Sequence, residues 1–238
     1  MSIPDLLKER PIETEVPYSV VRPVLSWVYI WMFFGLLATS VIAWTVAGNI
    51  EVFAQYLNRG TFLLLFIVQI GIAIGFGAAL NRMSPSLATV LFMIYSAITG
   101  FVFSVIFLVY DLPSISGAFI STAALFAVMS VIGFTTQVDL TKLGGILIMG
   151  LIGLIIAMVV NLFLNSGALG LIINILGVII FTGLAAYDTQ KIKRLAYAAA
   201  QRGDEAAQTK VSIFGAFILY LDFINLFLFI LRLTGRRR

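Results

Sequence analysis

The chain has 238 residues, of which 61% are hydrophobic and 11% are charged, whereas a soluble domain carries about 25% charged residues. Together with a mean hydropathy of +1.08, this composition excludes an ordinary soluble domain and indicates a polytopic membrane protein. The chain contains no His and no Cys, which excludes the usual zinc sites, thiol nucleophiles and Ser-His triads, so we predict neither enzymatic activity nor a cofactor.

The chain begins with a charged segment that contains no long apolar run. Residues 1–22 hold four acids and three bases, a balance that fits neither a secretory signal nor a transit peptide. A membrane-spanning helix needs roughly 20 apolar residues, and seven such runs follow. We predict an N-terminal tail over 1–22, a seven-helix membrane domain over 23–235 and a basic C-terminal tail over 236–238. The seven runs cover residues 24–47, 61–80, 86–110, 116–136, 143–164, 169–187 and 211–231.

The distribution of Lys and Arg predicts the orientation, because loops on the cytoplasmic side carry an excess of both. With the N-terminus inside, ten of the 15 basic residues lie in inside segments, and those outside are Arg59, Arg232, Arg236, Arg237 and Arg238. We therefore predict a cytoplasmic N-terminus and interpret the net charge of +4 as an orientation signal, not as evidence of nucleic-acid binding. A re-entrant last segment would return the basic tail to the inside, but residues 211–231 are long enough for a full crossing.

The last apolar run holds one acid, Asp222, near its middle. A carboxylate at the bilayer centre costs about 2.5–3.5 kcal/mol on insertion scales, and intramembrane acids usually mark ion or proton pathways. Asn225 lies on the same helix face, Ser212 and Gly215 continue that face toward the helix start, and Arg232 ends it. This polar stripe makes Asn225 and Arg232 candidate pore residues. The alternative is that Asp222 and Asn225 only join helices by hydrogen bonds.

A second acid, Asp188, follows the sixth apolar run before any Lys or Arg appears. It could pair with Lys191 one turn later, at the start of an amphipathic segment over 188–204 that lies in the membrane interface. Alternatively, Asp188 could pair with Asp222, because both acids belong to consecutive spans and both would lie toward the inner leaflet or the midplane. In a chain without His, a response to pH near neutrality would require carboxyl groups that share a proton.

Arg82 closes the second apolar run, on the same inner side as Asp188 in the predicted topology. It could serve only as a positive anchor. Its functional role would be that of a gate latch, a guanidinium that holds a carboxylate until that carboxylate protonates. Within the same run, the spacing of Gly71, Gly75 and Gly77 predicts a close helix contact, since small residues let helix backbones approach.

Two motifs give the sequence a specific family resemblance: AAYDTQKIK ends the sixth run, and LYLDFINLFLFILRL fills the seventh. Together with seven spans and LNRMSP after the second, they resemble bacterial members of the Bax inhibitor-1 family over residues 20–235. The resemblance implies an all-α integral membrane protein with six helices around a central C-terminal helix. It also implies a pH-sensitive calcium leak channel, in which Asp188 and Asp222 form a hydrogen-bonded sensor pair and Arg82 can bond the first aspartate.

The leading functional hypothesis is therefore a proton-gated Ca²⁺ leak, with Asp188 and Asp222 as the pH sensor and a transient Ca²⁺ contact. Two side chains fall far short of the 6–8 oxygens that Ca²⁺ prefers, so Ca²⁺ is the permeant ion and not a cofactor. An H⁺-coupled cation exchanger could use the same acids as a proton relay. A non-conducting regulator of a membrane protease or complex would need them only for structure. The expected partners are the lipid bilayer, Ca²⁺, H⁺ and other membrane proteins, and the expected location is the bacterial cytoplasmic (inner) membrane.

Overall fold

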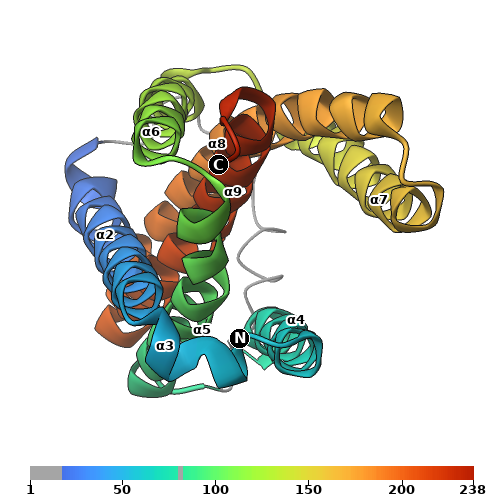
Figure 1. The fold of residues 1–238 in the computed structure, drawn as a ribbon. Helices are drawn as coiled ribbons and strands as arrows, with labels where there is room; N and C mark the ends of the chain where they lie inside the picture. The colour runs from blue at the N-terminus through green and yellow to red at the C-terminus, as the bar shows by residue number, and fades with distance from the viewer. Residues whose placement is uncertain (1–17, 80–82) are drawn as a thin grey trace. The chain divides into compact units, whose positions relative to one another are not determined.

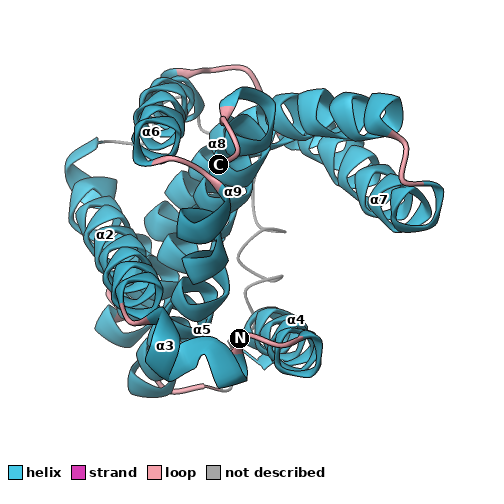
Figure 2. Ribbon diagram, viewed as in Figure 1, coloured by secondary structure: helices cyan, strands magenta, loops and turns pink. Residues whose placement is uncertain are grey.

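The computed structural model describes residues 18–79 and 83–238, and within these ranges the regular structure is helical, with no strand. Seven of the described helices are long and apolar enough to cross a membrane, which confirms the predicted all-α class and the number of spans. Figure 1 labels the helices, and Figure 2 separates helix from loop. The long helices are α2 (Tyr18–Gly48), α4 (Arg59–Ala79), α5 (Pro85–Val109), α6 (Leu112–Thr135), α7 (Thr141–Leu164), α8 (Gly167–Gln201) and α9 (Glu205–Thr234), and the short α3 (Ile50–Phe53) and η1 (Ala54–Tyr56) connect α2 to α4.

The connections between the helices are short and use residues suited to helix ends. Asp111 caps α6, where its Oδ1 accepts the Ser114 N–H at 2.8 Å, and Pro113 stands in the first turn. Asn165 ends α7 in the left-handed conformation, with φ 48°. Gly203 turns the chain between α8 and α9 with φ 65°. These ends lie close to the boundaries that the apolar runs predict.

Helix α8 is longer than the sixth apolar run and continues without a break through the segment that could have been interfacial. Its 35 residues span about 52 Å, well beyond the roughly 30 Å of bilayer hydrocarbon. Ile192, Leu195, Ala196 and Ala199 are each fully buried, so protein covers one face of this extension. Residues 188–201 of the predicted amphipathic segment are therefore part of α8, with one face packed against protein.

Helix α9 is the most buried of the described spans, with 72% of its apolar window buried against 6–33% for the others. Cover by protein suits this helix, because its mid-span acid Asp222 would be costly against lipid. The chain forms two compact units, Met1–Val109 with Ile192–Phe217 and Tyr110–Lys191 with Ile218–Arg238, and α9 contributes to both.

Aromatic rings carry much of the packing of α9 within each unit. In the first unit, Phe217 stacks on Phe76 at 4.4 Å between ring centroids and meets Tyr95 edge-on at 5.1 Å. In the second unit, Phe223 packs against Phe126 of α6 at 5.6 Å. Phe229 also stacks on Phe181 of α8 at 5.8 Å. The C-terminal helix thus packs against several others, as predicted for a central helix.

The glycines that permit close helix contacts are not the ones that the spacing predicted. A Cβ placed on Gly71, Gly75 or Gly77 would meet no described residue within 4 Å, so within this part of the chain the predicted contact is wrong. At Gly100 of α5, by contrast, a Cβ would lie 2.7 Å from the carbonyl oxygen of Thr39 in α2. The crossing of α2 and α5 in the first unit therefore requires glycine at position 100.

The C-terminal tail docks on the connection that precedes α6, within the second unit. Tyr110 and Arg237 form an antiparallel bridge, the Asp111 N–H donates to Arg236 O at 3.3 Å, and the Arg236 N–H donates to Ser114 Oγ at 2.9 Å. Seven full crossings place the tail and this connection on the same side of the membrane, whereas a re-entrant last segment would place them on opposite sides. The contacts therefore favour the full crossing by α9.

Candidate functional site

The two aspartates that the sequence singles out lie side by side in the second unit. Asp188 comes from α8 and Asp222 from α9, and their side chains are hydrogen-bonded to each other. Both residues are buried, with 8% and 5% of their surface exposed. An ionised carboxylate has no proton to donate, so a hydrogen bond between two carboxyl groups requires a proton on one of them. The pair can therefore hold a single shared proton inside the protein.

Lys191 is the cation next to this pair. Its Nζ lies 3.8 Å from Asp188 Oδ1, so the (i, i+3) contact that the sequence allowed is present. The same Nζ lies 5.9 Å from the centroid of the Tyr187 ring, a distance typical of a cation–π contact. The Lys191 side chain is 28% exposed, so water screens its charge in part. The lysine contact and the aspartate pair thus coexist, although the sequence left them as alternatives.

One carboxyl oxygen of Asp222, Oδ2, lacks a hydrogen-bond partner among the described residues. This oxygen is buried as well. Burying a polar oxygen without a partner costs on the order of 1–3 kcal/mol, which marks this atom as a place where an ion, a proton or a further side chain would be favoured. Arg82, the predicted latch, lies outside the described residues.

The remaining residues of the predicted stripe on α9 make contacts of their own. Asn225 Nδ2 donates to the Leu221 carbonyl oxygen of its own helix at 2.8 Å. Arg232 lies three helical turns beyond Asp222, about 15 Å along the axis, with its guanidinium 5.7 Å from the Phe229 ring centroid. Ser212 Oγ donates to the Val24 carbonyl oxygen at 3.2 Å, within the first unit. Several stripe residues therefore join or pack helices, and the ionisable groups that can share a proton are those of Asp188 and Asp222.

Two polar residues beside Asp188 are part of the site's support, and sequence reasoning did not single them out. Thr189 Oγ1 donates to the Ala185 carbonyl at 2.7 Å and lies 3.5 Å from Ser130 Oγ of α6. Gln190 holds the connection before α7 from both sides: its Nε2 donates to Val138 O at 2.8 Å, and its Oε1 accepts the Leu140 N–H at 3.0 Å. Both residues belong to the AAYDTQKIK motif, which marks the family resemblance but does not indicate their contacts.

Two glycines bring neighbouring helices against the same turn of α8. A Cβ on Gly133 of α6 would overlap the carbonyl group of Ala186, and a Cβ on Gly144 of α7 would overlap the ring of Tyr187. Backbone and aromatic contacts therefore hold the residues on either side of Ala186 and Tyr187 tightly. Such close packing fixes the rotation of α8, which in turn fixes the direction of the Asp188 side chain toward α9.

The pair alone does not make a resident metal site. Among the described residues, no three acidic, His or Cys side chains gather closely enough to hold an ion. Two carboxyl groups offer at most four oxygens, while Ca²⁺ prefers 6–8. The arrangement is suited to the uptake and release of a proton and to brief contact with a cation.

These features define a class of protein: a polytopic helical membrane protein with a buried carboxyl pair between its last two spans. A family model described as "Inhibitor of apoptosis-promoting Bax1" matches residues 21–238. The chain therefore belongs to the Bax inhibitor-1 family, as its motifs predicted, and it is an integral membrane protein.

Bacterial relatives are similar to this chain along nearly their whole length. Inner membrane protein YbhL of Escherichia coli (strain K12) is 43% identical over 223 residues, which cover 93% of this chain and 95% of that protein. An uncharacterised protein of Borreliella burgdorferi is 44% identical over 208 residues, 87% of this chain and 89% of its own length. An uncharacterised protein of Rickettsia prowazekii is 42% identical over 211 residues, 89% and 88% of the two chains.

Proposed function

We propose that the protein is a pH-sensitive calcium leak channel of the bacterial inner membrane, gated by the carboxyl pair of Asp188 and Asp222. The observation that carries this proposal is the hydrogen bond between two buried acids on adjacent membrane-spanning helices. Amide or hydroxyl side chains would join the helices at lower cost than an acid, so a pair of acids suggests use of the ionisable proton. The resemblance described above implies the same activity.

Protonation would act through the charge of the pair. With both carboxyl groups ionised, the pair carries two negative charges, which Lys191 and a latch such as Arg82 can balance. Uptake of the shared proton would remove one of these charges and weaken the attraction for the latch. Flux is therefore expected to rise as the pH falls through neutrality. Loss of the first proton would leave two adjacent charges, which a buried site disfavours.

Asp111 stays ionised over the pH range in which the Ca²⁺ flux is expected to change. Hydrogen bonds from the Ser114 side chain and N–H, aided by the charges of Arg236 and Arg238, hold the pKa of the Asp111 carboxyl below its usual value. A lowered pKa means that the capping interaction is fully present at neutral pH and is lost only as the pH falls through that lowered value. The cap therefore stays constant between pH 6 and 8.

Channel and exchanger differ in what they require of a second ion. We expect Ca²⁺ to enter liposomes that hold the purified protein when no counter-ion gradient is imposed. Flux that stops whenever a proton or cation gradient is collapsed would assign the same acids to an exchanger. Complete absence of flux in folded protein would favour a non-conducting regulator of a membrane protease or complex.

The orientation is proposed from the distribution of basic residues. We expect reporter fusions near Arg202 to give an inside signal, and fusions within residues 111–115 or after the C-terminus to give an outside signal. The C-terminal tail contacts the connection before α6, so fusions within residues 111–115 and fusions after the C-terminus must report the same side of the membrane. An outside signal near Arg202 would reverse the proposed orientation.

The latch role of Arg82 is tested by two substitutions. Arg82→Ala is expected to raise flux at neutral pH while leaving expression unchanged, because the ionised pair would lose its restraint. Arg82→Lys should restore the wild-type flux only in part, since an ammonium lacks the bidentate fork of a guanidinium. Wild-type flux from well-folded Arg82→Ala protein would leave this residue only an anchoring role at the membrane surface.

A further inference from the structure

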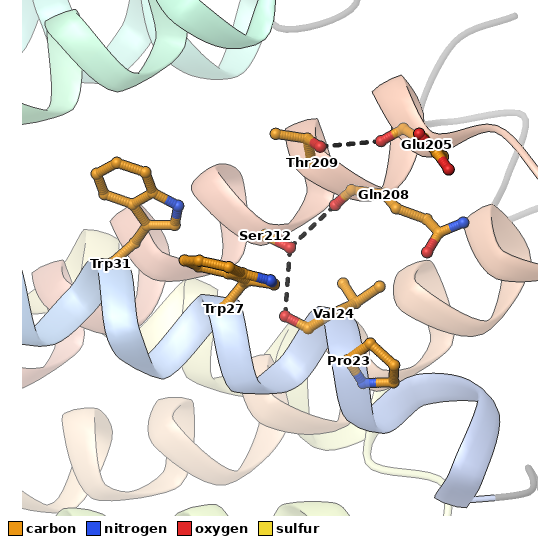
Figure 3. Close-up of a pocket in the computed structure, with 8 residues that line it drawn as sticks. All are labelled: Pro23, Val24, Trp27, Trp31, Glu205, Gln208, Thr209 and Ser212. Atoms are coloured by element: carbon orange, nitrogen blue, oxygen red, sulfur yellow. Dashed lines mark hydrogen bonds between the residues drawn. The ribbon is translucent and has the colours of Figure 1, made fainter.

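A second candidate site lies in the first unit, between α2 and the start of α9. Here a groove of about 430 Å³ is bounded by the N-terminal parts of both helices. Ser212 Oγ donates to Val24 O at 3.2 Å and so joins the two helices at the base of the groove. Figure 3 shows the indoles of α2 on the side that faces α9. The lining residues are Pro23, Val24, Trp27, Trp31, Glu205, Gln208, Thr209 and Ser212.

The groove combines aromatic faces with polar groups that the fold leaves available. The hydroxyls are already engaged, since Thr209 Oγ1 donates to Glu205 O at 2.9 Å and Ser212 Oγ donates to Val24 O and Gln208 O. Among the residues drawn in Figure 3, no hydrogen bond engages the carboxylate of Glu205, the amide of Gln208 or either indole N–H. Among the residues that the structure describes, a charged acceptor and several donors of the groove are therefore open to a ligand.

The charge of the groove selects a cation over an anion. Glu205 is the single ionisable residue among those that line it, so the lining carries one negative charge. The start of a helix usually attracts anions, but in α9 that position is already taken by Asp204, whose Oδ1 accepts the Ala207 N–H at 3.0 Å, and by Glu205 itself. An ammonium group is attracted both to a carboxylate and to the face of an indole.

The depth of the groove points to a lipid as the source of that ammonium. Trp27 lies nine residues into α2, about 14 Å from its start, in a helix of about 46 Å that exceeds the hydrocarbon thickness. Trp residues are enriched toward the ends of membrane-spanning helices, where lipid headgroups lie. Trp27 is 55% exposed, and Phe34 follows Trp31 along α2 with 6.3 Å between ring centroids, which offers an apolar path for an acyl chain.

We propose that this groove binds a phospholipid with a primary ammonium headgroup, such as phosphatidylethanolamine. The ammonium lies between the Glu205 carboxylate and the indole faces of Trp27 and Trp31. The indole N–H groups and the Gln208 amide donate to the phosphodiester and ester oxygens. A quaternary ammonium fits less well, because it cannot donate a hydrogen bond to the carboxylate. An anionic headgroup without an ammonium would meet a carboxylate and no lining base.

Quenching of tryptophan fluorescence by lipids with brominated chains tests this site directly. The chain has three Trp, and Trp44, which meets Phe107 edge-on at 5.6 Å, stands near the opposite end of α2. A Trp44→Phe background therefore leaves only Trp27 and Trp31 as reporters. The protein is placed in phosphatidylcholine vesicles that contain an equal fraction of brominated phosphatidylethanolamine, phosphatidylcholine or phosphatidylglycerol.

We expect brominated phosphatidylethanolamine to associate about two- to fivefold more strongly than either other lipid, and Glu205→Gln to remove that preference. Glu51→Gln is the matched control, because Glu51 is an exposed acid beyond the far end of α2, and it should leave the preference unchanged. Equal quenching by all three lipids would overturn the proposal, as would stronger quenching by phosphatidylglycerol. A preference that persists in folded Glu205→Gln protein, checked by circular dichroism, would also overturn it.

Discussion

Replacement of Asp222 by Asn is expected to flatten the pH dependence of Ca²⁺ flux while the protein stays folded. Asn fills nearly the same volume and can still hydrogen-bond to Asp188, but it cannot share a titrating proton with it. The ratio of flux at pH 6 to flux at pH 8 should therefore fall close to one. The measurement is Ca²⁺ entry into liposomes across this range, with the variant and the wild-type protein at equal reconstitution levels.

Asp188→Asn should give the same flat profile, because either substitution removes one half of the pair. The double variant should differ little from each single variant, a strong departure from additivity that is expected for residues in direct contact. Asp139→Asn provides a matched control, since Asp139 is an exposed acid in the connection before α7. If both single Asn variants kept a wild-type profile, the pair would be structural and the regulator hypothesis would take first place.

The second large effect is expected on stability, from the addition of one methyl group to α6. Gly133→Ala would place a Cβ against the carbonyl group of Ala186, and no side-chain rotation can relieve contact with a backbone. Overpacking of this kind typically costs about 1–3 kcal/mol, or several degrees in melting temperature for a chain of this size. Thermal unfolding in detergent measures the shift.

Gly153→Ala is the matched control for this substitution. Gly153 lies within α7 of the same unit, and a Cβ there would meet nothing within 4 Å. Because Ala favours the helix over Gly, this control should leave the melting temperature unchanged or raise it slightly. Equal melting temperatures for the two variants would contradict the close crossing of α6 and α8.

Hydrophobicity alone was enough to predict the seven membrane-spanning helices, whereas the central position of the last one was implied by the family resemblance. The bilayer leaves few solutions for an apolar run of 20 residues, so the seven runs correspond to the seven long helices. The same reasoning singled out Asp222, because an acid in the middle of a membrane-spanning helix is costly whichever neighbours that helix has. The pairing of Asp222 with Asp188 followed from their positions in consecutive spans and from the family resemblance.

Contacts between helices could not be predicted from spacing. The clustered glycines of α4 suggested a packing face, yet a Cβ at Gly71 would enter open space, whereas Gly133 and Gly144 lie in tight contacts. A glycine permits the close approach of another helix, but the position of that approach depends on the partner helix. The role of Gln190 was missed for the same reason, since its partners at residues 138–140 are distant in sequence.

The full length of α8 could not be predicted from its apolar run, which ends at residue 187. Lys191, Lys193 and Arg194 allowed a segment at the membrane surface, but the neighbouring Ile192 and Leu195 are fully buried against the protein. Alternating basic and apolar residues are compatible with either environment, and only tertiary contacts distinguish the two.

Ca²⁺ entry into liposomes that contain the purified wild-type protein, measured from pH 8 to pH 6, tests the central proposal most directly. Protein-free liposomes and the folded Asp188→Asn, Asp222→Asn double variant serve as references. We predict a passive flux that increases as the pH falls, with its midpoint near neutrality and no need for a counter-ion gradient. A wild-type flux that equals that of protein-free liposomes, or one that is unchanged across this pH range, would contradict the proposal of a proton-gated leak.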